Sequence, residues 1–146
     1  MKVQITTDIT LEPVTLTEVK DALKVSGTGH DTELERLITD ARQYIERAID
    51  TSVSTRTLQV TNDVALEEWE LPFGPVADLV ETTGTDWDDN TTYIYTYTGG
   101  DDECPAEIKR LITMLIKHWY DIDDEAVALP KVISNEIKLR TRQPGF

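Results

Sequence analysis

The chain of 146 residues is long enough for one domain with one modest core, and an apolar content of 39% is typical of a folded protein. Its formal net charge is −14, and no apolar run approaches the roughly 18 residues that a membrane-spanning helix needs. The first residues contain no apolar signal core, and the single cysteine, Cys104, cannot form an internal disulfide. We therefore expect a protein made in the cytoplasm.

The negative charge is concentrated in the middle of the chain. Between Thr57 and Ile108 there are 13 carboxylates and no Lys or Arg, whereas the rest of the chain holds all 14 basic side chains against 15 acidic ones. Such a block cannot grip a nucleic-acid backbone, because that binding depends on cations that neutralise phosphates. It can form a solvated face, line a channel that repels DNA, or meet a basic partner.

A first helix is predicted over residues 15–25. Thr15 and Glu18 have the spacing of a capping box, in which two side chains satisfy the first free amides of a helix. Gly27 and Gly29 are expected to end this helix, because glycine readily adopts the left-handed conformation found there.

The second predicted helix, over residues 31–50, has the strongest pattern in the chain. Asp31 or Thr32 can cap it. The opposite face is charged and includes Arg42 and Glu46. Apolar side chains recur at spacings of three and four, which predicts one continuous apolar stripe formed by Leu34, Leu37, Ile38, Ala41, Ile45, Ala48 and Ile49.

A β insertion is predicted over residues 55–99. Residues 55–61 and 92–98 are rich in β-branched side chains, a composition typical of strands. Strands are expected at residues 55–61, 69–72, 75–82 and 92–98, with Gly84 after the third and the turn Asp88–Asn90 before the fourth.

Two further helices are predicted after the insertion, over residues 105–121 and 131–141. The first opens with Pro105, a residue favoured in the first helical turn. The fold class is therefore mainly α (α+β), a small bundle of amphipathic helices with a β-strand insertion between the second and third helices. The two long helices are expected to pack together through Leu37, Ile38, Ala41, Ile45, Leu111, Ile112, Leu115 and Trp119.

Residues that could carry chemistry are few and scattered. His30, His118 and Cys104 lie far apart in the sequence and lack the spacing of a zinc site, so no metal is expected. The segment Asp86–Asn90 begins like a calcium loop, but Thr91 stands where that loop requires glycine, which favours a hairpin turn. No acid and base are paired, so we expect no catalytic residues, no cofactor and no enzymatic activity.

Four segments, in this order, resemble one known family. They are the threonine-capped helix in Val14–Val25, the long helix in Asp31–Ile49, the strand in Tyr95–Gly100, and the helix that contains Cys104–Lys109 and Leu115–Tyr120. Together they are similar to the head-to-tail connector (adaptor) proteins of tailed bacteriophages.

The resemblance implies a single connector domain over residues 1–146, without catalytic residues. It implies a homo-oligomeric ring, commonly of twelve copies, in the neck of the virion beneath the portal protein. Such a ring extends the DNA channel toward the tail, and a stopper or tail-completion protein binds its other side. DNA would pass through without specific binding, no membrane would be involved, and the chain would be made in the cytoplasm of a host bacterium.

Two hypotheses about surfaces follow from the charge pattern. The first is that acidic residues line the ring lumen and keep DNA from adhering: Glu67, Glu68, Glu70, Asp86, Asp88 and Asp89. The second is that the C-terminal arm, residues 130–146, is set off from the bundle and docks on the portal through Lys131, Val132, Ile133, Ile137, Lys138, Leu139, Arg140 and Arg142. The alternative for this arm is that it folds back onto its own bundle.

A competing hypothesis from another class is an acidic DNA mimic that blocks a nucleic-acid-binding protein. The acidic block alone supports it. It does not account for two long amphipathic helices or for the basic C-terminal segment.

Overall fold

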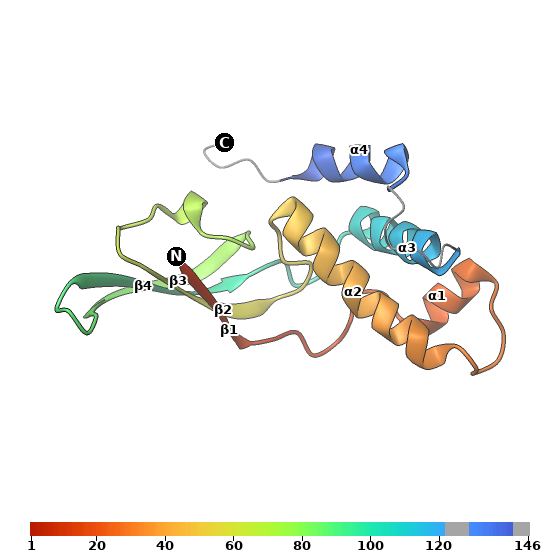
Figure 1. Cartoon of the computed structure of the whole chain (residues 1–146), viewed down its shortest axis with the longest axis horizontal. Coiled ribbons are helices and arrows are strands. Elements are labelled where there is room, and N and C mark those ends of the chain that lie inside the picture. The colour runs from red at the N-terminus through yellow and green to blue at the C-terminus, as the bar shows by residue number, and fades with distance from the viewer. Residues whose placement is uncertain (122–128, 142–146) are drawn as a thin grey trace. The chain divides into compact units, whose positions relative to one another are not determined.

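The computed structural model describes residues 1–121 and 129–141, which group into two compact units. One unit contains Met1–Thr10 and Asp50–Glu103, and the other contains Leu11–Ile49 together with the described part of Cys104–Thr141. The first holds the strands and the second the α-helices (Figure 1). The predicted α+β class is confirmed, whereas one connector domain over residues 1–146 stays a prediction.

The first unit is built on an antiparallel sheet of four strands in the order β1-β2-β4-β3. The strands are β1 (Lys2–Thr7), β2 (Arg56–Asn62), β3 (Val76–Thr85) and β4 (Thr91–Gly99). Strands β2 and β4 lie in the centre, and β1 and β3 form the two edges.

One face of this sheet carries the core of the first unit. Leu58, Val60, Tyr95 and Tyr97 are buried there together with Leu71 from the segment between β2 and β3. Hydrogen bonds between this segment and the hydroxyls of Tyr95 and Tyr97 hold it against the sheet. Tyr97 donates to the carbonyl of Pro72 at 2.6 Å, and Tyr95 accepts from the amide of Leu66 at 2.7 Å.

The strand predictions were partly wrong. No strand was predicted at β1. Residues 69–72 are not a strand, because the chain forms a short 3₁₀ helix, η1 (Glu68–Glu70), and Glu70 accepts a hydrogen bond from the amide of Glu67 at 2.7 Å. Strand β3 also continues through Gly84, where its pairing with Thr92 of β4 is unbroken.

The second unit consists of α1 (Leu16–Leu23), α2 (Asp31–Ile49), α3 (Ala106–Asp121) and α4 (Lys131–Arg140). No described helix is long and apolar enough to cross a membrane.

The predicted start of α1 is confirmed, but its predicted end is wrong. The hydroxyl of Thr15 accepts from the amide of Glu18 at 3.2 Å, as a capping residue does. The helix ends at Leu23, four residues before Gly27, because Lys24 adopts the left-handed conformation at φ 57°.

Helices α2 and α3 pack against each other through their apolar stripes, as predicted. The prediction that Trp119 belongs to this core is wrong. Trp119 is only partly buried and meets Tyr44 edge to face, with ring centroids 5.7 Å apart. The other predicted contact residues are buried: Leu37, Ile38, Ala41, Ile45, Leu111, Ile112 and Leu115.

We expect Leu115→Ala to lower the free energy of unfolding by about 2–5 kcal/mol, because Leu115 is fully buried and its loss leaves a cavity. Chemical denaturation measures the change. Lys117→Ala, an exposed position on the same helix, is the matched control and should leave stability within about 0.5 kcal/mol of the parent. An unchanged midpoint for Leu115→Ala would contradict the packing of α3 described above.

Candidate protein interaction surfaces

The turn between β3 and β4 is an acidic tip that is closed by hydrogen bonds and carries an exposed tryptophan. The Asp86 carboxylate accepts hydrogen bonds from the amides of Asp88 and Asn90 at 2.8 and 2.9 Å and from the Asn90 side chain at 3.1 Å. The Asn90 side chain and then these amides lower the pKa of Asp86. The predicted hairpin turn is thus confirmed, and it presents the Trp87 side chain 92% exposed.

The six carboxylates predicted to line a lumen lie in two groups in the first unit. Glu67, Glu68 and Glu70 are exposed on and beside η1. In the hairpin tip, Asp88 and Asp89 are exposed and Asp86 is half-buried. All six carboxylates thus lie at or near the surface, and the lumen role of this set stays a prediction.

Helix α4 packs on its own bundle, so the prediction that the C-terminal segment is set off from it is wrong. Ile133 is buried, Ile137 is half-buried, and the Thr141 hydroxyl donates to the Ala48 carbonyl of α2 at 3.2 Å. The alternative, in which this segment folds back, is the one observed for α4. The predicted docking residue Arg142 lies outside the described residues.

The outward face of α4 combines apolar and basic side chains. Val132 is 59% exposed and Leu139 is 79% exposed, with Lys131 and Lys138 exposed beside them. Arg140 is held differently: it pairs with Glu136 on its own helix and lies 3.8 Å from the Glu107 carboxylate of α3. Beside Val132 and Arg140, α3 and α4 border a small hollow of about 60 Å³ floored by Leu111 and Met114.

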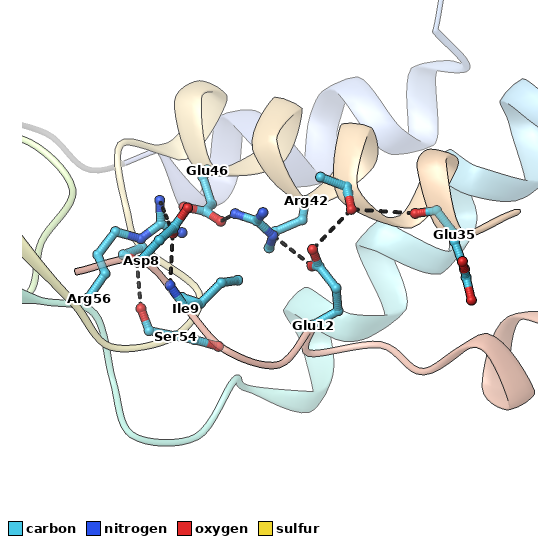
Figure 2. Close-up of polar contacts among 10 residues, drawn as sticks. Asp8, Ile9, Glu12, Glu35, Arg42, Glu46, Ser54 and Arg56 are labelled. Atoms are coloured by element: carbon cyan, nitrogen blue, oxygen red, sulfur yellow. Dashed lines mark hydrogen bonds and ion pairs between the residues drawn. The ribbon is translucent and has the colours of Figure 1, made fainter. Parts of the chain in front are cut away.

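A buried ion network in the second unit ties the segment before α1 to the middle of α2. Arg42 lies between two carboxylates, with its Nε donating to Glu12 and its Nη1 donating to Glu46, both at 2.7 Å (Figure 2). Thr39 also donates to Glu12, at 3.1 Å. Burial by itself lowers the pKa of Arg42, but the hydrogen bonds and charges of the two glutamates outweigh it and raise that pKa.

The residues that the sequence offered for chemistry do not form a site. Cys104 is buried, and this burial raises the pKa of its thiol to about 11, so it remains protonated near neutral pH. His30 precedes α2 and meets the ring of Tyr120 edge to face at 6.0 Å. Among residues 1–121 and 129–141, no group of three His, Cys, Asp or Glu side chains is arranged to hold a metal ion.

Residues 13–75 match the model of a known family. The model of the family described as "Phage gp6-like head-tail connector protein" matches residues 13–75, which contain α1, α2, β2 and η1. The resemblance to head-to-tail connectors is confirmed. A comparison with curated proteins finds no match.

Solved structures show a similar fold over nearly the whole length of this chain. The fold is similar to a chain in the neck of an empty gene transfer agent (GTA) particle computed with C6 symmetry, with a TM-score of 0.76 and 14% identity over 98% of this chain and 96% of that one. A chain in the virion of a native GTA particle has a TM-score of 0.74 and 16% identity over 97% and 95%. A chain in the neck of a native GTA particle computed with C12 symmetry has a TM-score of 0.70 and 15% identity over 98% and 96%. At these identities the likeness shows a shared fold.

The ion network around Arg42 offers a stability test. We expect Arg42→Met to cost about 3–5 kcal/mol, because it breaks the buried ion pair with Glu46, which is 2% exposed, and also removes the pair with Glu12. The double variant Arg42→Met with Glu46→Leu should recover part of this loss, since both charges of this buried pair are then replaced by apolar groups. Urea denaturation measures both. A single variant as stable as the parent would show that the network contributes little.

Proposed function

We propose that this protein is a structural subunit of a virion neck, a head-to-tail connector that forms a ring beneath the portal and extends the DNA channel toward the tail. The observation that carries the proposal is the match of residues 13–75 to the connector family. The fold shared with neck chains over 98% of this chain supports it. No step of this function requires a catalytic residue.

The proposed assembly is a homo-oligomeric ring, with twelve copies as the expected number. The neck structures with a similar fold were computed with C6 and C12 symmetry, and a twelve-membered ring is compatible with both. A stopper or tail-completion protein is the proposed partner on the side away from the portal. The acidic-mimic hypothesis has no comparable support, because it predicts neither the connector match nor this fold.

The outward face of α4 is the proposed portal-docking surface. It consists of the exposed residues Lys131, Val132, Lys138 and Leu139. Val132 and Leu139 are apolar side chains exposed to water, and a partner protein would bury them. Lys131 and Lys138 beside them favour an acidic groove on that partner. Ile133 and Ile137 would support this surface from within, because they are turned toward the bundle.

We expect the double variant Val132→Asp and Leu139→Asp to weaken portal binding tenfold or more, by removing the apolar anchors and adding repulsion. Co-sedimentation with purified portal rings measures binding, and electron microscopy of the parent with portal tests the ring. Val64→Asp is the matched control, since Val64 is 68% exposed in the other unit. Both variants should melt within a few degrees of the parent, and unchanged portal binding by the double variant would refute the docking role of α4.

The acidic residues of η1 and the hairpin tip are proposed to face the lumen. Carboxylates on the lumen wall would repel the DNA phosphates, so the duplex would pass through the ring without adhering to it. Reversal of the exposed charges Glu68, Asp88 and Asp89 to Lys leaves intact the hydrogen bonds of Asp86 and Glu70 that shape the two elements.

We expect this triple reversal to leave ring assembly unchanged and to slow DNA ejection, most strongly at low salt, where screening is weakest. Ejection kinetics from particles assembled with the variant provide the measurement. The matched control reverses three exposed carboxylates outside the acidic block, Asp21, Glu35 and Asp40, and should eject DNA at the parental rate. Parental kinetics for the acidic-block variant at low salt would count against a lumen role.

A further inference from the structure

The sheet of the first unit has two open edges. Strands β1 and β3 lie at opposite ends of the order β1-β2-β4-β3, and no other described strand pairs with the outer side of either. All six residues of β1 are exposed, and β3 is exposed over most of its length. Such edges present unpaired amides and carbonyls that can add another strand, and proteins usually cover or disrupt them.

Each open edge has an irregularity near one end. In β1 the register with β2 shifts between Ile5 and Thr7, which leaves Lys2–Ile5 in regular pairing. In β3 the irregularity lies near the start of the strand. The register with β4 shifts between Ala77 and Val80, and Asp78 in this bulge has φ 53°. Bulges of this kind protect an edge. The remaining stretch, Val80–Thr85, pairs with β4 without a shift and is as long as β1.

We propose that these two edges join neighbouring copies of the chain: β3 of one copy pairs with β1 of the next, so that the sheet continues around the ring. The proposal rests on the ring of the proposed function and names the contact that builds it. A contact between two different surfaces of identical chains repeats from copy to copy, and it closes into a ring when the rotation allows.

The strand directions suit this contact. Each neighbouring pair in the sheet is antiparallel, so β1 and β3 run in opposite directions. In a ring of twelve, neighbouring copies differ by a rotation of about 30°, which leaves strand directions nearly unchanged. Strand β1 of the next copy therefore meets β3 in antiparallel orientation, the more stable type of pairing.

The two faces of the sheet restrict the register. Val3 lies across from Val60, which lies across from Tyr95 and then Glu81, so these residues share the face that carries the core. Ile5 shares this face in β1, as do Thr83 and Thr85 in β3, whereas Gln4 and Gly84 lie on the other face. A continuous sheet must pair residues of the same face.

Several registers of β1 against β3 keep the two faces aligned. One of them places β-branched side chains opposite each other and also brings opposite charges together. It places Val3 opposite Thr85 and Ile5 opposite Thr83, which are β-branched pairs that stabilise antiparallel strands. It also places Lys2 opposite Asp86, the first residue of the acidic hairpin tip. The register two residues away sets Ile5 opposite the carboxylate of Glu81 and moves Lys2 away from the tip.

Pairing of like edges is less favourable. Two β3 edges would bring together Asp78, Glu81 and the acidic tips of both copies, where no Lys or Arg lies nearby in the sequence. Like charges placed opposite each other destabilise strand pairs. The proposed contact, between β3 of one copy and β1 of the next, instead brings Lys2 to the acidic β3 edge.

The contact also gives a ring of workable size. Four strands about 4.8 Å apart occupy about 19 Å per copy, so twelve sheets joined edge to edge would span a circumference of about 230 Å. The corresponding radius is about 37 Å, which leaves the centre open for a duplex.

Disulfide trapping in the full-length protein tests the contact. Two double variants are used, Val3→Cys with Thr85→Cys and Gln4→Cys with Gly84→Cys. Directly opposite residues alternate between hydrogen-bonded pairs and the closer non-hydrogen-bonded pairs, so one of the two variants has the shorter spacing that a disulfide favours. The native Cys104 is buried and should not take part.

Oxidised samples are separated on a non-reducing denaturing gel, and the parent is imaged by electron microscopy. We expect at least one double variant to give a ladder from dimer up to about twelve linked chains, because each copy would link to two neighbours. The control Lys2→Cys with Thr85→Cys places its thiols on opposite faces and should give no ladder. The single variants should give none either.

The outcomes separate this contact from the proposed function. Rings in the images without a ladder from either double variant would overturn the edge contact and leave the ring standing. A ladder from open chains without closed rings would support the contact and count against the ring. Linked dimers from Val3→Cys alone would show that β1 pairs with β1, and neither ladder nor rings would overturn both proposals.

Discussion

The buried ion network around Arg42 is the constraint on which the helical unit depends. Its guanidinium joins Glu46 on the same helix to Glu12, which precedes α1, so it fixes the path by which the chain enters the bundle. Ion pairs buried in this way rarely add much stability compared with apolar residues of similar size, but a missing partner is costly. The network therefore selects one arrangement of the segment before α1 more than it strengthens the unit.

The helices were predictable because their signals are local. Thr15 caps α1 through a hydrogen bond to Glu18, three residues away, and the stripes of α2 and α3 repeat every three or four residues. Seven of the eight predicted contact residues are buried because a stripe also specifies which side of a helix faces its partner. Trp119, at the end of the α3 stripe, is only partly buried, since α2 offers it the half-exposed ring of Tyr44.

Three features could not be predicted from the sequence, because they depend on contacts between residues that are far apart in the chain. They are the ion network, strand β1 and the packing of α4. Arg42 and Glu46 lie on the charged face of α2, and the hydrogen bond from Arg42 to Glu12 joins residues that are far apart in the sequence. Strand β1 has no buried residue of its own and exists by pairing with β2, although the alternation of Val3 and Ile5 was a signal for it. Helix α4 has a weak apolar pattern, so its packing through Ile133 could not be distinguished from a free docking arm.

The exposed apolar side chains of this acidic chain are best understood as parts of an assembly. Trp87, Leu139, Val3 and Ile5 are exposed in the single chain, and their burial in contacts with other chains would be favourable. In the proposed edge contact, Val3 and Ile5 lie in the joint between copies. Trp87 directly follows Asp86, the residue that meets Lys2, so it lies at the margin of the contact between copies. There its large indole side chain can exclude water from the ion pair between Lys2 and Asp86. Within the acidic tip, Asp86 would then meet Lys2 of the next copy, while Asp88 and Asp89 would repel DNA in the lumen.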